Sequence, residues 1–413
     1  MKKTVIIGAG ISGLAMATLL KEKGQEVVVF EMESLPGGLI KCDRVDGNLF
    51  HRTGGHVFNT KRQDVLDWFW KHFDKERDFT KALRNSSVAM PEGMMIPYPI
   101  ENHAYLFDES TKKAFIEDLV IIAKAEEQHP KNFEDFLRGR FGATLYNIYF
   151  QPYNYKVWRR DLKNVSLSWL EGKLPMPTVT ELIYNNINHV EERTFVHSSF
   201  FYAKKDGSQF IANELAKNLD IRYDKRVESL ELKGNKWLVN SEEADCVVFC
   251  GNIKQLPSLV ERFVNLDSFV KPIMELESHG TTSVFCEIEQ NPYSWIYLPC
   301  RAYESHRIIC TGNFTPSNNS QGKMTATIEF TDAITKEEIL ENLSRMPYSP
   351  KYLAHHYEQY TYPIQSATTG EMISSLKHTT EASGLYLLGR FAEWEYYNMD
   401  VAIGAAIDLI KRL

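Results

Sequence analysis

A short apolar strand followed by three spaced glycines opens the chain and constrains what can follow. Residues 5–7 (Val-Ile-Ile) lead into Gly8-x-Gly10-x-x-Gly13. In this pattern glycine permits a tight turn, then a close approach of the backbone to a pyrophosphate, then packing of the next helix on the sheet. A helical stretch from Ser12 to about Lys23 and a second apolar strand ending at Glu31 complete a βαβ unit. We therefore predict a doubly wound α/β sheet that binds a dinucleotide, with Glu31 accepting the ribose hydroxyls.

The composition is that of an ordinary globular protein and narrows the possible partners. The 413 residues suit two or three domains, and 43% of them are hydrophobic. The formal net charge of −7 comes without a basic stripe, so we expect no nucleic-acid partner. Outside the glycine-punctuated N-terminus no apolar run approaches the ~18 residues of a membrane span. Residues 21–23 (Lys-Glu-Lys) replace the small residues of a signal-peptide cleavage site, so we expect a cytoplasmic protein.

The cysteine and histidine patterns give no sign of metal or disulfide chemistry. The six cysteines are scattered without a CxxC pair, and Cys246 and Cys250 bracket an apolar strand in which small buried hydrophobes are ordinary. His355 and His356 are adjacent, and on the helix that we expect there, neighbouring side chains do not face one ligand. We expect no metal site and no disulfide.

Hydrophobic periodicity divides the rest of the chain. Apolar spacing is helical in residues 115–122 and 133–137, whereas strand patterns return near Phe200 and include residues 227–232 and 247–249. A second β-rich stretch has its clearest strands at 283–288 and 294–298, for which we expect an antiparallel sheet. The predicted organisation is a discontinuous dinucleotide-binding domain (1–75, 195–265 and 375–413), a helical insertion (105–194) and an antiparallel β-sheet substrate domain (76–104 and 266–374).

The cofactor class follows from a first resemblance. No second phosphate fingerprint is present, so the sequence supports a single nucleotide site. The chain resembles FAD enzymes of the glutathione reductase type, which combine the N-terminal fingerprint, a Glu closing the second strand, a further Gly-Gly and a C-terminal strand-to-helix turn. A helix N-terminus at the flavin pyrimidine would stabilise the anionic reduced ring. The resemblance implies FAD bound by Gly8, Gly10, Ile11, Ser12, Gly13, Glu31, Gly38, Leu39, Gly55, His56, Val227, Gly389, Arg390, Met399 and Asp400.

A second resemblance narrows the function. Six local motifs follow one another along the chain: Gly54-Gly55-His56-Val57-Phe58, Ile96-Pro97-Tyr98-Pro99, residues 152–158 (PYNYKVW), residues 295–299 (WIYLP), Arg307 ahead of residues 312–314 (GNF), and residues 389–397 (GRFAEWEYY). In this order they are similar to the UDP-galactopyranose mutases, within the wider FAD and amine oxidase-like superfamily. The resemblance implies isomerisation of a nucleotide sugar between pyranose and furanose forms, with N5 of reduced flavin forming a covalent adduct with the anomeric carbon. It also implies an external reductant such as NAD(P)H and possible homo-oligomers.

The mutase resemblance assigns roles to individual residues. Arg307 would clamp the pyrophosphate bidentately, as a planar guanidinium can. Tyr297, Tyr362 and Tyr396 would donate neutral hydroxyls to the same phosphates. Tyr149, Asn154 and Trp158 have the spacing of one helical face and would line the uridine end. We expect His56 to shape the environment of flavin N5, because the preceding glycines allow a close approach.

Two departures from the family pattern leave the sugar and the nucleotide open. Lys173 stands where the family has the second arginine of the phosphate clamp, so the charge is kept but the two-pronged geometry is lost. Ala203 and Asp206 stand where the family usually has a proline and a double glycine, and His197 stands near a family asparagine. The predicted catalytic residues are therefore His56, Arg307 and Lys173. Lys173 and His197 are also predicted to bind the substrate. Another UDP- or dTDP-hexose would also fit these changes.

Two alternatives share the N-terminal motifs. A flavin oxidase or dehydrogenase of the amine oxidase or protoporphyrinogen oxidase type would need an apolar cage and an electron acceptor, whereas a mutase needs a cationic, tyrosine-rich slot for a diphosphate. Arg307 and the three tyrosines favour the mutase. The second alternative is a flavin-binding protein without catalytic activity, whose flavin would fail to cycle between its redox states.

Overall fold

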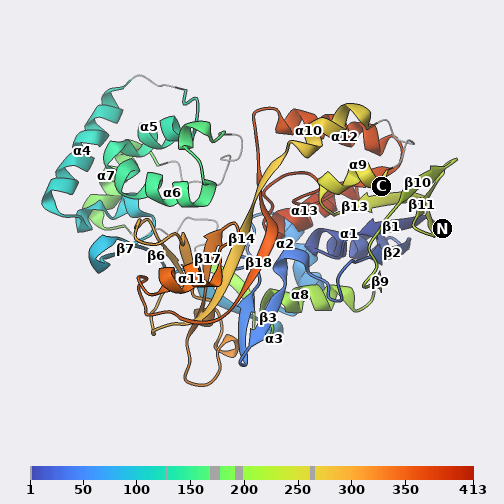
Figure 1. Cartoon of the computed structure of the whole chain (residues 1–413), viewed down its shortest axis with the longest axis horizontal. Coiled ribbons are helices and arrows are strands. Elements are labelled where there is room, and N and C mark those ends of the chain that lie inside the picture. The colour runs from blue at the N-terminus through green and yellow to red at the C-terminus, as the bar shows by residue number, and fades with distance from the viewer. Residues whose placement is uncertain (1, 126–128, 168–176, 191–198, 261–265) are drawn as a thin grey trace.

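The computed structural model describes residues 2–125, 129–167, 177–190, 199–260 and 266–413. Figure 1 shows a helical lobe on one side, a parallel sheet with its helices on the other, and the two long strands β14 (Glu277–Glu287) and β18 (Lys351–Ile364) between them. Both predicted classes of sheet are present, so the predicted fold class is confirmed. The residue limits proposed for the three domains stay a prediction.

The parallel sheet has the order β19-β13-β1-β2-β9, with every neighbouring pair parallel. Its strands are β1 (Lys3–Ile7), β2 (Glu26–Phe30), β9 (Asp220–Arg222), β13 (Cys246–Phe249) and β19 (Leu385–Leu387). Ile6 packs into a core with α1 (Ile11–Glu22) and α13 (Met399–Leu409), whereas Val5 and Ile7 pack into a second core on the opposite face. Successive strand residues point to opposite faces, so a sheet covered on both sides needs the unbroken apolar runs seen in the sequence.

The seven-stranded sheet has the order β18-β14-β17-β16-β15-β6-β7. Besides β14 and β18 it contains β17 (Thr325–Thr331), β16 (Arg307–Ile309), β15 (Trp295–Tyr297), β6 (Ser86–Ala89) and β7 (Met95–Pro97). Its neighbouring strands are antiparallel as predicted, except for β15 and β6, which are parallel and come from distant parts of the chain.

The helix expected at His355 and His356 is wrong, because both residues lie in β18. The segment alternates exposed and half-buried side chains along an outer strand, a period of two that adjacent polar residues conceal in a helical reading. Adjacent strand residues point to opposite faces, so the conclusion that they do not share a ligand is unchanged.

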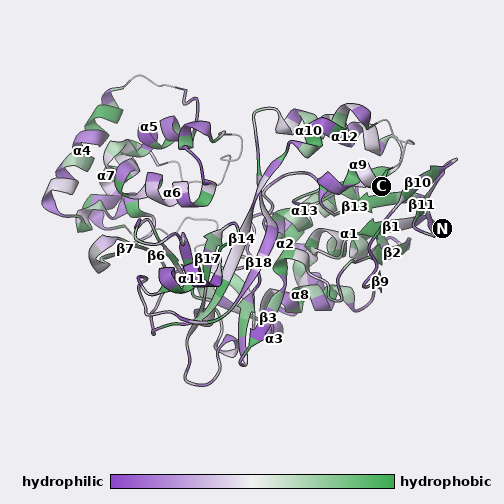
Figure 2. Ribbon diagram, viewed as in Figure 1, coloured by the Kyte–Doolittle hydropathy of each residue, from purple (hydrophilic) through white to green (hydrophobic). Residues whose placement is uncertain are grey.

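The predicted helical insertion forms a lobe with its own core. It contains α4 (Glu109–Lys124), α5 (Phe133–Leu145), a π-helical turn at Tyr146–Phe150, α6 (Gln151–Trp158) and α7 (Val179–Asn188). The core includes Phe115, Leu119, Phe133 and Leu137 from the predicted apolar positions. In Figure 2 the helices of this lobe carry both green and purple residues, as expected of helices with one buried face.

The remaining helices and strands connect these parts. They are α2 (Gln63–His72), α3 (Lys75–Asp78), α8 (Gly207–Ala216), α9 (Leu256–Leu259), α10 (Asp267–Met274), α11 (Lys336–Leu343), α12 (Thr369–Glu381), β3 (Cys42–Val45), β4 (Asn48–His51), β5 (Phe79–Leu83), β8 (Ser199–Ala203), β10 (Leu230–Lys233), β11 (Lys236–Val239) and β12 (Glu242–Ala244). None of the helices within the described ranges is long and apolar enough to cross a membrane.

Candidate active site

The glycine-rich turn between β1 and α1 is packed too tightly for a side chain at Gly13. A Cβ on Gly13 would lie 2.0 Å from the carbonyl oxygen of Gly8, so only glycine lets α1 start against the strand. The Gly37 N–H donates to the carbonyl of Ala9 at 2.8 Å, which brings the second glycine pair beside the first turn. Ile11 and Ser12 begin α1, and the serine Oγ lies 2.8 Å from where a Cβ on Gly389 would be. Residues predicted to bind the cofactor therefore meet from both ends of the chain.

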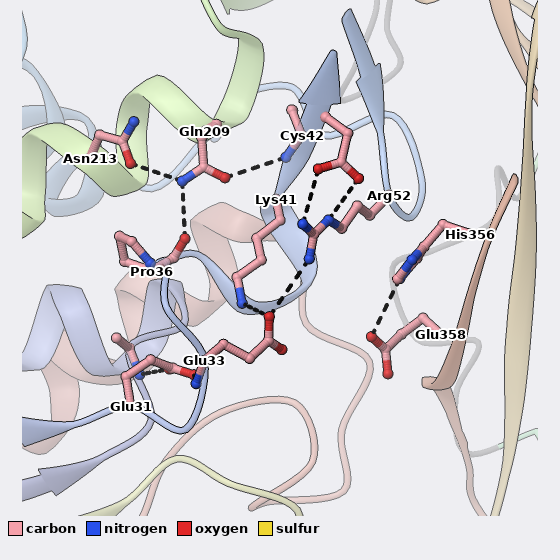
Figure 3. Close-up of polar contacts among 12 residues, drawn as sticks. Glu31, Glu33, Pro36, Lys41, Cys42, Arg52, Gln209, Asn213, His356 and Glu358 are labelled. Carbon is pink, nitrogen blue, oxygen red and sulfur yellow. Dashed lines mark hydrogen bonds and ion pairs between the residues drawn. The ribbon is translucent and has the colours of Figure 1, made fainter. Parts of the chain in front are cut away.

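Glu31 is held in place at the end of β2. Its buried carboxylate accepts the N–H of Ala9 at 2.7 Å and the N–H of Glu33 at 3.0 Å. Figure 3 shows the Glu33 carboxylate in turn between Lys41, at 2.6 Å, and Arg52, at 3.6 Å. These contacts fix the acid where ribose recognition requires one.

The Gly54-Gly55-His56 segment lies against the seven-stranded sheet. A Cβ on Gly55 would lie 2.7 Å from Cγ2 of Ile309, and the Gly54 N–H donates to Oε1 of Glu329 at 2.8 Å. His56 Nε2 is shielded from solvent and has no hydrogen-bond partner among the described residues. Burial, followed by the positive charge near it, lowers the pKa of His56 to about 3, so its imidazole is neutral near pH 7.

Three neighbouring strands place Tyr297, Arg307 and Glu329 in one row. Tyr297 on β15 is directly opposite Arg307 on β16, which is directly opposite Glu329 on β17. Directly opposite residues share a face, so the three side chains project together. The guanidinium donates through Nε to the fully buried Glu329 carboxylate and through Nη2 to the Tyr362 hydroxyl, at 2.9 Å.

The electrostatics of this row favour a permanently charged pair. Burial opposes ionisation of Glu329, but the adjacent Arg307 holds the pKa of the carboxyl well below its usual range. Burial likewise opposes the charge on Arg307, and the attraction of Glu329 raises the pKa of the guanidinium well above its usual value. His306 Nε2 lies 3.5 Å from the same carboxylate. Arg307 is therefore a fixed cation, although much of its charge is offset by its partner.

Tyrosines from the helical lobe and from the sheet gather around this row. The ring of Tyr297 lies 4.8 Å from that of Tyr98 and 5.6 Å, edge to face, from that of Tyr153 on α6. Tyr149 lies 5.6 Å from Tyr153, in a stacked arrangement. Burial raises the pKa values of Tyr98, Tyr149 and Tyr153 well above the usual value, so their hydroxyls are neutral donors.

A second pair of tyrosine rings lies near Arg307. Tyr362 and Tyr396 stack with ring centres 5.5 Å apart, and the Arg390 guanidinium lies 4.6 Å from the centre of the Tyr396 ring. Arg390 also donates to the backbone carbonyls of Tyr397 and Thr361. Burial raises the pKa of Tyr362 above its usual value despite Arg307. The result is a cluster of tyrosine rings with guanidinium groups among them.

The remaining predicted residues fall as follows. Asn154 donates to the carbonyl of Phe150 at 2.8 Å within the helix, and Trp158 ends α6. Val227 precedes β10, which begins at Leu230 and so later than predicted. Leu39 accepts a hydrogen bond from the Thr53 hydroxyl at 2.7 Å, beside the Gly-Gly-His segment. Met399 and Asp400 begin α13, where burial raises the pKa of Asp400. Lys173 and His197 lie outside the described residues.

The sequence analysis missed Glu329, Tyr98, Tyr153 and Arg84 as members of this cluster. Glu329 had a usable signal, because it is the one ionisable residue in the strand Thr325–Thr331, whose side chains are all buried. Tyr98 and Tyr153 lie inside motifs that were recognised for other residues. Arg84, which donates to the Tyr297 hydroxyl at 2.5 Å, had no local signal, since the two residues lie 213 positions apart.

The parallel sheet, the glycine turn and the acid that ends β2 define a Rossmann-like dinucleotide-binding protein, and residues 6–73 match the family of NAD(P)-binding Rossmann-like domains. Along its whole length the chain is similar to nucleotide-sugar mutases. It is 24% identical to dTDP-fucopyranose mutase of Escherichia coli, over 99% of this chain and 97% of that one. It is 22% identical to UDP-galactopyranose mutase of Mycoplasma pneumoniae, over 99% and 95% of the two chains.

Solved structures agree with this similarity. A crystal structure of reduced UDP-galactopyranose mutase matches with a TM-score of 0.89 at 20% identity, covering 100% of this chain and 95% of that one. A putative protoporphyrinogen oxidase from Exiguobacterium matches with a TM-score of 0.76 at 16% identity, covering 100% and 98%. The fold is common to both, and the resemblance to the mutases read from the motifs is confirmed over the whole chain.

Proposed function

We propose that the chain is a flavin-dependent mutase that interconverts the pyranose and furanose forms of a nucleotide sugar. The observation that carries this proposal is the position of Arg307, set among Tyr297, Tyr153 and Tyr362 and joined through Glu329 to the Gly54-Gly55-His56 segment. A diphosphate slot directly beside the cofactor loop suits a reaction at the anomeric carbon, which carries the diphosphate. An oxidase of the same fold has no use for such a slot.

The cofactor site suits FAD. The carboxylate of Glu31 is held by two backbone N–H groups at the ribose position, and the turn at Gly13 leaves room for backbone alone beside the pyrophosphate. His56 offers a shielded, unpartnered nitrogen at the opposite end of this site. When bound in its reduced form, the flavin supplies a nucleophilic nitrogen, N5, for reversible attack on the sugar. An external reductant such as NAD(P)H belongs to the same proposal.

The residues of the chain then have distinct tasks. Arg307 and the tyrosine hydroxyls bind and orient the diphosphate, which sets the anomeric carbon beside the cofactor. The positive charge of Arg307 also stabilises the negative charge of the diphosphate as it leaves. The lobe residues Tyr149 and Tyr153 cover the slot and exclude water from the reacting carbon. His56 stays neutral and accepts or donates one hydrogen bond through Nε2.

Product analysis under reducing conditions tests the proposal. The purified flavoprotein is reduced anaerobically with dithionite and incubated in parallel with UDP-galactose, UDP-galactofuranose and dTDP-fucopyranose, and the products are separated by chromatography. We expect ring interconversion of at least one nucleotide sugar with the reduced protein and none with the oxidised protein. Absence of interconversion with all three, together with oxygen consumption on an amine or a porphyrinogen, would establish the oxidase alternative instead.

A further inference from the structure

Arg84 lies beside Tyr297, on the side away from Arg307. The residue follows β5 and precedes β6, the strand that pairs with β15 at Tyr297. Its Nη2 donates to the Tyr297 hydroxyl at 2.5 Å and its Nε to the Ser86 hydroxyl at 2.8 Å. The guanidinium carbon lies 5.6 Å from the ring centre of Tyr98 and 5.2 Å from that of Trp295. The cation is thus held in one orientation by uncharged groups.

The charges of Arg84 and Arg307 differ in one respect. Arg307 is paired with the buried carboxylate of Glu329, so the pair carries little net charge. Among the residues that the structure describes, no carboxylate lies within ion-pair distance of Arg84, which is half-buried. A half-buried guanidinium stacked on aromatic rings without a carboxylate is suited to receive an anion from outside the chain.

A bound nucleotide sugar brings two negative charges on its diphosphate, and Arg307 alone is already largely neutralised. Tyr297 lies between the two guanidinium groups and is predicted to donate to the same phosphates. An oxygen accepting from the Tyr297 hydroxyl would therefore be within reach of Arg84 as well. We propose that Arg84 is a further diphosphate-binding cation, which contacts the phosphates across Tyr297 from Arg307. This inference rests on the proposed function and assigns a substrate-binding residue that the motifs do not identify.

Binding of UDP and of uridine separates a phosphate contact from a general effect on the site. The dissociation constants are measured by calorimetry for the flavin-bound wild type, Arg84→Gln and Arg84→Lys, with Arg345→Gln as a matched control at an exposed position just after α11. We expect UDP affinity to fall about 10-fold to 100-fold in Arg84→Gln and less in Arg84→Lys, because one charged hydrogen bond is lost or weakened. We expect uridine affinity, and both affinities of the control, to be unchanged.

The other outcomes of the binding measurements distinguish the role of Arg84 from the proposed mutase function. Equal UDP affinity in Arg84→Gln and the wild type overturns the role of Arg84 while leaving the mutase proposal standing. Failure of the wild type itself to bind any nucleoside diphosphate overturns both. A double-mutant cycle with Tyr297→Phe tests whether Arg84 acts only by orienting that hydroxyl. If Arg84→Gln has no further effect in the Tyr297→Phe background, a direct phosphate contact is excluded. The flavin spectrum of each variant verifies that the protein is folded.

Discussion

At the scale of single residues, buried charge is the most consequential feature of the candidate site. Glu329 is fully buried and accepts from Arg307 and from the Gly54 backbone, so one carboxylate orients the diphosphate cation and the cofactor loop together. A buried ion pair contributes little relative to an apolar core, but removing one partner leaves a charge without compensation. The Arg307–Glu329 pair therefore acts mainly by fixing the position of the guanidinium relative to the cofactor loop.

Replacing Glu329 by Gln should destabilise the protein by about 3 kcal/mol, because Arg307 would lose its carboxylate in a largely buried site. Urea unfolding of the flavin-bound protein measures the change. Glu341→Gln is the control, since Glu341 forms an exposed pair with Arg345 whose loss should cost less than about 1 kcal/mol. Equal stability of the two variants would show that the buried pair is not held as described.

His51 should make stability depend on pH. Its Nε2 is hydrogen-bonded to the Tyr202 hydroxyl at 2.8 Å, and burial lowers the pKa of this histidine to about 4. Because the unfolded chain takes up the proton below about pH 6.5 and the folded chain does not, stability is complete above that pH and decreases as the pH falls toward 4. The full effect is about 3 kcal/mol.

Melting temperatures of the wild type and His51→Gln between pH 7.5 and pH 4.5 test this. The wild type should lose more stability over this range than His51→Gln does. His378→Gln, at an exposed position of α12, should follow the wild type. Parallel profiles for all three proteins would contradict a buried neutral His51.

At the scale of elements, backbone clearance and short tethers position the site. The turn before α1 admits no Cβ at Gly13, and α6 is tied to the loop between β15 and β16 by one lysine. The first feature involves residues close together in the sequence, whereas the lysine contacts residues at least 142 positions away. The clearance at Gly13 and the contacts of the lysine decide how closely two elements pack.

Gly13→Ala should lose the cofactor, because the new methyl group would lie 2.0 Å from the Gly8 carbonyl and push α1 away from the strand. The ratio of flavin to protein absorbance after purification measures retention. Gly370→Ala is the control, since no atom apart from the adjacent residues and the backbone of α12 itself lies within 4 Å of the Cβ it would add. Full flavin retention in Gly13→Ala would contradict the described packing.

Lys156→Met should destabilise the contact between lobe and sheet by about 2–4 kcal/mol. Its buried Nζ donates to the carbonyls of Leu298, Cys300 and Ser305 at 2.6, 2.6 and 2.9 Å, and methionine would leave these acceptors without their donor. Urea unfolding followed by tryptophan fluorescence measures the loss. Lys163→Met, at an exposed position nearby, should unfold like the wild type, and a similar result for Lys156→Met would refute the tether.

At the scale of the whole molecule, the proposed diphosphate site belongs to no single part of the chain. Tyr153 comes from the helical lobe, Tyr297 and Arg307 from the seven-stranded sheet, and Tyr396 from the segment between β19 and α13. A ligand that contacts all of them binds only when these parts are assembled. Ligand binding should therefore stabilise the folded state as a unit.

UDP should raise the melting temperature of the flavin-bound protein, and the increase should grow with UDP concentration. At 100 times its dissociation constant, a ligand that binds only the folded state adds about 2.7 kcal/mol. Uridine at the same concentration should have a smaller effect, because it lacks the phosphates that Arg307 would bind. Differential scanning calorimetry provides the measurement, and identical curves for UDP and uridine would exclude a diphosphate slot.

Much of the cofactor half could be predicted from the sequence, because its signals are local. The βαβ unit, Glu31 and the glycine turn follow from spacing within some thirty residues, and the structure holds them together as expected. The helix expected at His355 was wrong because adjacent polar residues on this outer strand conceal its period of two in the sequence. Lys173 and His197 remain predictions, as does the assignment of each site residue to cofactor or substrate.

The sequence by itself determined the class of sheet, the dinucleotide turn and the order of motifs that relates this chain to the mutases. Only the tertiary structure decided which charges meet. Strand register set Glu329 opposite Arg307, and the parallel pairing of β6 with β15 brought Arg84 to Tyr297 from 213 residues away. The physical reason is that spacing along a chain specifies local backbone geometry, whereas contacts between distant residues depend on strand order and on the packing of whole elements.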